Sequence, residues 1–98
     1  MQVKKWNEAD FSVERNIEVM FEYEGSKEIK ITLAKGGKLE DHKAPKQIGV
    51  QVLSGKIKFG VGGEYFEMSA MDSIFLAQGV VHSLEGLENS IVRLSLYA

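Results

Sequence analysis

Two histidines, His42 and His82, are the residues of this 98-residue chain with the clearest chemical use. A neutral imidazole can ligate a transition metal, orient a ligand through a hydrogen bond, or exchange a proton near neutral pH. The chain has no cysteine, which excludes a disulfide framework, a thiolate metal site and a cysteine nucleophile. Neither Ser73 nor Ser83 lies in a nucleophile-elbow pattern, so serine hydrolase chemistry is not expected. Any site therefore depends on whether the fold brings the two histidines together.

Alternating apolar and polar residues predict about nine short strands and no long helix. The expected strands are residues 17–23, 29–33, 39–42, 48–53, 56–61, 65–68, 74–77, 80–84 and 90–97. Turn signals separate these strands, and Gly62-Gly63 predicts a tight hairpin. The only proline, Pro45, interrupts the pattern after the third strand, because proline cannot donate to a sheet ladder. The pattern is typical of an all-β sandwich or barrel.

Residues 1–15 are the least strand-like part of the chain. Asn7 followed by acidic residues predicts a short N-terminal helical turn with Asn7 as its cap. Trp6 and Phe11 would then cover one end of the core. Residues 16–98 are expected to form the barrel, and a chain of this length is expected to be one domain, residues 1–98.

The charge pattern argues against several classes of partner. The formal net charge is −2 and the basic residues are scattered, which does not favour binding to a nucleic-acid backbone. No apolar run approaches ~18 residues, so no membrane-spanning helix is expected. The first ten residues lack the apolar core of a signal peptide. We therefore expect a cytoplasmic protein that contacts neither nucleic acid nor membrane.

The two histidines lie in stretches that resemble the two signature motifs of the cupin superfamily. The first motif reads G-x5-H-x-H-x3-E-x6-G, and its spacing is met here by Gly36, His42, Ala44, Ile48 and Gly55. The second reads G-x5-P-x-G-x2-H-x3-N, and its spacing is met by Met71, Ala77, Gly79, His82 and Gly86. The chain resembles the small single-domain cupins with a conserved barrel. This resemblance implies a double-stranded β-helix, also called a jelly roll, that is often dimeric.

Members of this family hold a divalent metal with two histidines and a glutamate of the first motif and one histidine of the second. By this resemblance, His42 and His82 are candidate ligands for iron, manganese, nickel or zinc. Ala44 and Ile48 stand where the family has its second histidine and its glutamate. Gln47 becomes a possible third ligand if a bulge near Pro45 turns its side chain inward.

The main functional hypothesis is a small-molecule site without an assigned reaction or catalytic residue. Apolar residues at two of the four ligand positions favour a mainly apolar ligand, oriented by hydrogen bonds to the two imidazoles. The expected pocket is formed by His42, Ala44, Ile48, Val50 and His82. Barrels resembling this one also serve as ligand-binding domains of transcription regulators.

Two alternatives remain open at this stage. The first is a metal-dependent enzyme of the dioxygenase, isomerase or decarboxylase type, with His42 and His82 as metal ligands. The second is an oligomerisation scaffold with a closed, fully packed interior. The resemblance also implies a homodimer, and its expected surfaces are the N-terminal segment with Trp6 and the strand 17–23.

Overall fold

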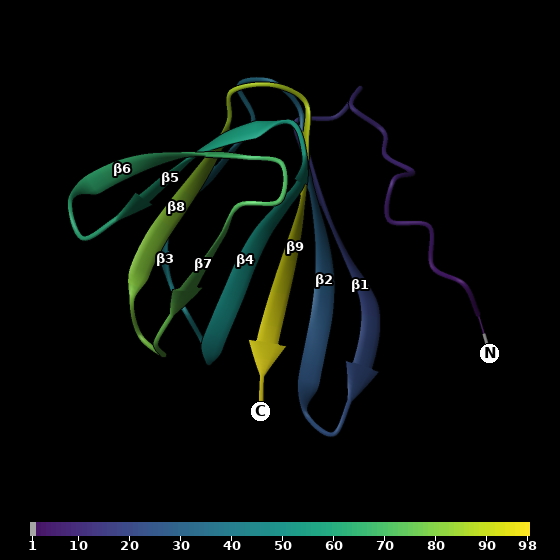
Figure 1. The fold of residues 1–98 in the computed structure, drawn as a ribbon, viewed down its shortest axis with the longest axis vertical. Coiled ribbons are helices and arrows are strands. Elements are labelled where there is room, and N and C mark those ends of the chain that lie inside the picture. The colour runs from purple at the N-terminus through teal and green to yellow at the C-terminus, as the bar shows by residue number, and fades with distance from the viewer. Residues whose placement is uncertain (1) are drawn as a thin grey trace.

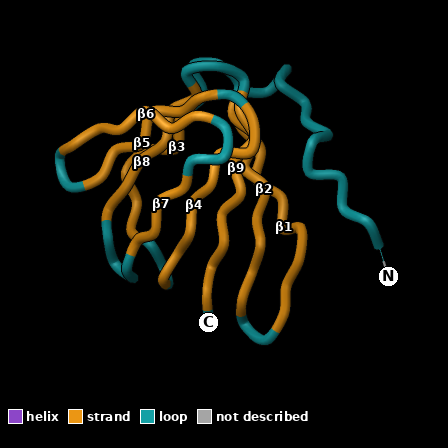
Figure 2. The backbone as a smooth tube through the Cα atoms, viewed as in Figure 1, coloured by secondary structure: helices purple, strands orange, loops and turns teal. Residues whose placement is uncertain are grey.

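The computed structural model describes residues 2–98, in which nine strands form two antiparallel sheets (Figures 1 and 2). The strands are β1 (Arg15–Tyr23), β2 (Ser26–Leu33), β3 (Lys38–Lys43), β4 (Gln47–Ser54), β5 (Lys56–Val61), β6 (Glu64–Ser69), β7 (Ser73–Leu76), β8 (Val81–Gly86) and β9 (Ser90–Tyr97). One sheet has the order β1-β2-β9-β4-β7 and the other the order β3-β8-β5-β6. The predicted all-β architecture of about nine strands is confirmed.

The core lies between the two sheets and follows the alternation in the sequence. On β4, Ile48, Val50 and Val52 are at most 2% exposed, while the residues between them face outward. From the opposite sheet, Ile57 and Phe59 of β5 are fully buried against the same cluster. Fully burying each such side chain stabilises the fold by roughly 1.5–3 kcal/mol, so the alternation determines which face of β4 and of β5 points inward.

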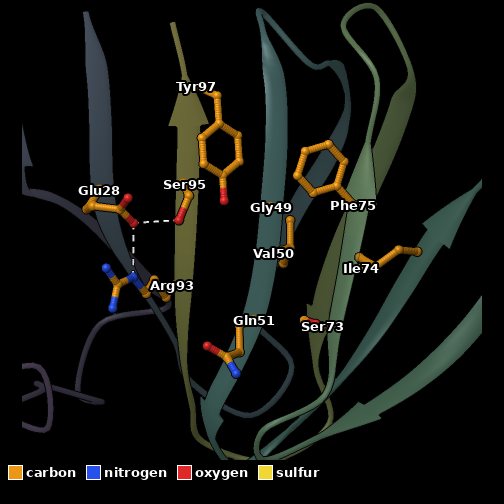
Figure 3. Close-up of a pocket in the computed structure, with 10 residues that line it drawn as sticks. All are labelled: Glu28, Gly49, Val50, Gln51, Ser73, Ile74, Phe75, Arg93, Ser95 and Tyr97. Atoms are coloured by element: carbon orange, nitrogen blue, oxygen red, sulfur yellow. Dashed lines mark hydrogen bonds and ion pairs between the residues drawn. The ribbon is translucent and has the colours of Figure 1, made fainter. Parts of the chain in front are cut away.

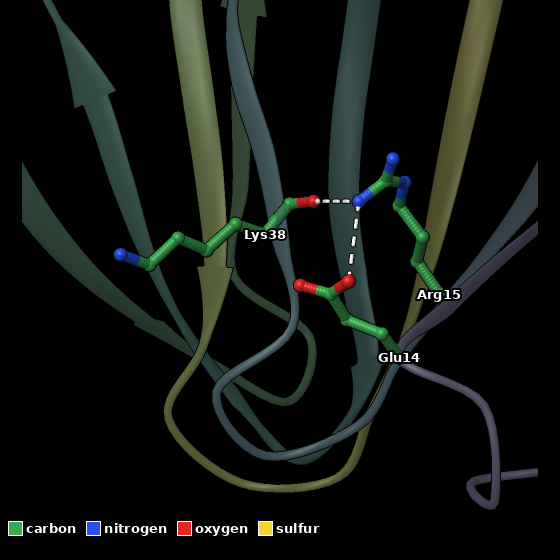
Figure 4. A network of polar contacts seen from close by, with 3 residues as sticks. All are labelled: Glu14, Arg15 and Lys38. Carbon is green, nitrogen blue, oxygen red and sulfur yellow. Dashed lines mark hydrogen bonds and ion pairs between the residues drawn. The ribbon is translucent and has the colours of Figure 1, made fainter.

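Local signals fix the ends of the strands. Gly62 and Gly63 have φ values of 60° and 78°, the left-handed pair that a two-residue hairpin between β5 and β6 requires. At the other end of the barrel, Arg15 Nη1 donates to the backbone oxygen of Lys38 at 3.1 Å and lies 3.5 Å from the carboxylate of Glu14 (Figure 4). This contact ties the start of β1 to the start of β3, and so joins the two sheets.

The N-terminal segment differs from the prediction, because residues 2–98 contain no helix (Figure 2). In place of the predicted helical turn there is a single loose turn, in which the amide of Glu8 donates to the Lys5 oxygen at 3.4 Å. The buried Lys30 ammonium of β2 also donates to the backbone oxygens of Lys5 and Glu8. A helix this short is marginal in water, and the contacts with Lys30 satisfy the same carbonyl groups outside a helix.

Contrary to the prediction, Trp6 does not cover an end of the core. Its ring lies 5.0 Å from the guanidinium carbon of Arg93, which projects from the outer face of β9. The N-terminal segment therefore contacts side chains on the outer side of the larger sheet, and in Figure 1 it runs beside β1. No helix able to cross a membrane is found among residues 2–98.

Candidate functional site

A β-bulge in β3 brings the two histidines together. Leu39 pairs with Leu84 and His42 pairs with His82, so two residues of β3 lie opposite the single residue between them on β8. In a regular strand, residues three apart point to opposite faces. The extra residue restores His42 to the inner face, where Leu39 also packs. The bulge therefore aims His42 at His82.

The two imidazoles lie side by side, one in the core and the other exposed to solvent. The ring centres of His42 and His82 are 4.2 Å apart, at an angle of 58°. His82 is only 3% exposed and stacks on Phe59, with ring centres 5.8 Å apart and planes inclined by 11°. His42 is exposed. The pair thus sits at the mouth of the barrel, with one ring held by the core and the other accessible from outside.

Backbone carbonyls define the protonation of both rings. His42 Nδ1 lies 2.8 Å from the oxygen of Glu40, and His82 Nδ1 lies 3.1 Å from the oxygen of Val80. A carbonyl only accepts, so each Nδ1 carries the proton and donates it. In a neutral ring, Nε2 is then an acceptor. The site can therefore offer two acceptor nitrogens to a hydrogen-bond donor.

Burial keeps the inner ring of this pair neutral. Desolvation lowers the pKa of His82, and the hydrogen bond to the Val80 carbonyl opposes this shift. The neighbouring His42 lowers the pKa further, while Asp41 raises it. Desolvation is the largest of these effects, so His82 is uncharged at neutral pH.

The other residues of the predicted pocket belong to the packed core. Ala44, Ile48 and Val50 are each at most 2% exposed and belong to the main apolar cluster. The backbone of Ala44 also binds the turn that leads into β8, donating to Val80 and accepting from Gly79. Their side chains therefore give the barrel interior an apolar lining, and their role in ligand binding stays a prediction.

Gln47 points away from the histidine pair. It is exposed and pairs with Tyr97, and the register continues without interruption to Ile48 and Leu96. No bulge turns the side chain inward at this point of β4, because the irregularity in this strand lies near its other end. Gln47 therefore adds no third donor to His42 and His82.

The donor set does not fit the metal centre that the resemblance implies. Zinc-type sites use three or four protein ligands, usually including a charged one. His42 and His82 offer two neutral nitrogens, and the Ala44 and Ile48 side chains offer none. Within residues 2–98, no group of three or more histidine, aspartate or glutamate side chains is arranged to hold a metal ion. Metal binding by His42 and His82 therefore stays a prediction for metal analysis to test.

A separate cavity of about 500 Å³ lies on the outer face of the larger sheet (Figure 3). Its lining includes Gly49, Gln51, Phe75, Arg93 and Tyr97, all on outward positions of their strands. The strand pattern of the sequence does not predict this cavity. The available signal was a glycine in the middle of a strand, which often marks a close approach of a ligand or backbone.

Comparisons with known proteins identify the fold. No family model and no curated protein sequence matches the chain. An RmlC-like cupin protein from Desulfovibrio desulfuricans superposes with a TM-score of 0.85 at 16% identity, over 98% of this chain and 94% of the other. A cupin 2 conserved barrel domain protein from Leptotrichia buccalis gives 0.78 at 27% identity, over 86% of this chain and 41% of its own.

A third solved structure is the cupin domain of an XRE family transcriptional regulator from Enterobacter cloacae. It matches with a TM-score of 0.72 at 18% identity, over 88% of this chain and 99% of the domain. The architecture is that of a jelly-roll barrel. The predicted resemblance is confirmed at the level of the fold: the chain has the fold of these small cupin barrels.

Proposed function

We propose that this protein binds a small, mainly apolar molecule at the barrel mouth, where His42 and His82 orient it through hydrogen bonds. The observation that carries the proposal is that each Nδ1 lies within hydrogen-bonding distance of a backbone oxygen, which assigns the proton to Nδ1 in both rings. Both Nε2 atoms are then acceptors, on two rings whose centres are 4.2 Å apart. A ligand with a hydroxyl or amide N–H group suits this pair.

The surroundings of the pair support an apolar ligand body. Val61 lies directly opposite His82 on β5, and Val80 precedes β8. Both are half-buried and pack against the main core, as does Leu39 beside His42 on β3. Specific small-molecule sites commonly combine such apolar walls with a few placed polar groups.

A sensing role is consistent with one of the structural neighbours. The cupin domain from Enterobacter cloacae belongs to a transcriptional regulator, and this chain matches nearly all of that domain. We propose by this analogy that ligand binding here serves detection rather than turnover. The net charge of −2 does not favour contact with a DNA backbone, so the proposed role is detection of the ligand alone.

The competing proposal is a metal-dependent enzyme. Nδ1 atoms held by backbone oxygens are the usual outer support of histidine metal ligands, which favours this alternative. The missing carboxylate and the outward Gln47 oppose it. No catalytic step is assigned, because two imidazoles alone define neither a reaction nor a substrate.

Elemental analysis of protein purified without a histidine tag separates the two proposals. The expected result for a binding module is no retained metal after exposure to iron, manganese, nickel and zinc. Near-stoichiometric metal that disappears in both His42→Ala and His82→Ala would support the enzyme instead. A thermal-shift screen of apolar compounds bearing one hydroxyl or amide then tests binding, and the same two variants should lose the shift.

We also propose that the protein forms a homodimer through β1. This strand is an edge of the larger sheet, and its apolar residues Ile17, Val19, Phe21 and Tyr23 are 48–64% exposed. An uncovered edge with exposed apolar residues favours pairing with another chain. Sedimentation should give a dimer for the native protein and a monomer for Phe21→Lys. A native monomer at high micromolar concentration would contradict this proposal.

A further inference from the structure

The outer cavity of the larger sheet is built differently from the barrel mouth. Gly49 lies in the centre of β4, paired with Phe75 on one side and with Ser95 on the other. With no side chain at this position, the cavity floor is backbone. A Cβ on Gly49 would lie 3.2 Å from the Tyr97 hydroxyl, so a side chain at this position would occupy the floor and Tyr97 would have to shift by a few tenths of an ångström.

Two aromatic rings stand along one part of this cavity. Phe75 and Tyr97 stack with ring centres 5.5 Å apart and planes inclined by 21°. Despite this contact they are 62% and 41% exposed, so part of their surface remains available. Figure 3 shows the two rings at one end of the cavity and the polar side chains Gln51 and Arg93 toward the other. The negative face of an aromatic ring attracts C–H groups.

The polar end is held in place by a fixed ion pair. Arg93 Nε donates to Glu28 Oε1 at 2.9 Å, and the hydroxyl of Ser95 donates to the same oxygen. The guanidinium also lies against the Trp6 ring. Within residues 2–98, the terminal nitrogens of Arg93 and the second oxygen of Glu28 make no hydrogen bond. The site therefore holds both donors and an acceptor in a defined position.

The balance of charge in this cavity selects an uncharged ligand. An anion near Arg93 also meets the carboxylate of Glu28, and a cation near Glu28 also meets the guanidinium. Hydroxyl groups both donate and accept, so they can satisfy both partners at once. A molecule with many hydroxyl groups and a C–H face that stacks on Phe75 or Tyr97 fits the two ends together.

We propose that this cavity is a second binding site, on the face of β4 opposite the histidine pair, and that it takes a neutral sugar. A volume of about 500 Å³ lies in the range of small-molecule sites. The sugar ring would stack on the exposed aromatic surface while its hydroxyls bind Arg93 and Glu28. The site does not depend on ligand binding at the barrel mouth, because the packed core residues of β4 separate the two.

The test is an NMR titration of ¹⁵N-labelled protein with glucose, galactose, mannose, maltose and cellobiose, each to about 100 mM so that millimolar affinity is visible. At least one sugar should shift the amides of Gly49, Ser73 and Ser95. Phe75→Ala should weaken that sugar about tenfold, because one stacking contact of this kind contributes up to ~1.5 kcal/mol. His42→Ala should leave the affinity unchanged, which separates this site from the barrel mouth.

The matched control is Tyr65→Ala, which removes an equally exposed aromatic ring from the outer face of the other sheet. This variant should bind the sugar as the native protein does. Three outcomes would overturn the proposal. In the first, none of the five sugars shifts these amides; in the second, sodium benzoate shifts them and no sugar does. In the third, diluting the protein without any ligand shifts the same amides. The last result would assign this face to self-association.

Discussion

Two stacked ring pairs, one on the inner face of the smaller sheet and one on the outer face of the larger sheet, differ in their burial. Inside the barrel, Phe59 and His82 stack with ring centres 5.8 Å apart and are at most 3% exposed. Outside, Phe75 and Tyr97 stack at 5.5 Å but remain largely exposed. Similar ring geometry thus holds the core together in one place and leaves surface for a ligand in the other. Burial, rather than the contact itself, decides which of these roles a pair can have.

The largest expected effect tests this difference directly. Phe59→Ala removes a fully buried ring and should lower the free energy of unfolding by about 3–5 kcal/mol. Phe75→Ala removes an exposed ring, and its cost should stay within about 1 kcal/mol. Urea unfolding of both variants beside the native protein measures these changes. Equal losses would mean that the outer ring pair is also part of the stabilising core.

A second prediction restores the missing donors on the inner face. Ala44→His combined with Ile48→Glu rebuilds the ligand set that the cupin resemblance implies around His42 and His82. Nickel or zinc at a hundredfold excess over its dissociation constant should then raise the free energy of unfolding by about 2.7 kcal/mol. The native protein should show no such increase in the same unfolding assay.

Gln47→His combined with Gln51→Glu serves as the control, because both positions lie on the outer side of β4, the strand that carries Ile48. This variant should behave like the native protein on addition of metal. Metal-dependent stabilisation of the native protein would contradict the prediction and favour the enzyme alternative.

The sequence predicted the strands well because their inner faces alternate regularly, as Ile48, Val50 and Val52 show. It could not predict the bulge in β3, because nothing in the residue types of Glu40 and Asp41 indicates that both will lie opposite a single residue of β8. The predicted N-terminal turn failed for a different reason: Lys30, distant in sequence, binds the carbonyls that a helix would use. These features depend on partners that only the folded sheet brings near.

The outer cavity was hidden for a related reason. The alternation pattern predicts Gly49, Phe75 and Tyr97 as strand residues and gives them no shared role. They lie on three strands, and only the order β9-β4-β7 makes them neighbours. The histidine pair, by contrast, was predicted from its resemblance to the two cupin motifs. Their spacing is kept in this chain, although two of the four ligand positions hold other residues.

A third prediction concerns pH and the inner ring pair. An unfolded His82 takes up a proton near pH 6.5, whereas the folded protein holds its pKa below that value because the ring is buried. Between these two values the unfolded state binds more protons, so stability falls as the pH drops below about 6.5. The nearby titrating groups are His42 and Asp41, and their effects on the pKa oppose one another.

Urea unfolding at pH 7.5 and pH 5.5 measures this loss. His82→Phe should reduce the difference in free energy of unfolding between the two pH values, because the replacement keeps a ring against Phe59 but cannot take up a proton. His42→Gln should retain most of it, since desolvation of His82 is the dominant cause. A native protein equally stable at both pH values would show that His82 is charged or solvated in the folded state.

The position of β9 has a consequence for how the chain folds during synthesis. β9 lies in the middle of the larger sheet, between β2 and β4, yet it is the last strand along the chain. Lys27 pairs with Leu96, so the β1–β2 hairpin waits for a partner almost seventy residues away. All strands of the smaller sheet lie within residues 38–86 and can pair earlier. On the ribosome, the β1–β2 hairpin with its apolar surface therefore has no β9 to pair with until β9 has been synthesised. During that interval, a chaperone or a second nascent chain can bind the hairpin.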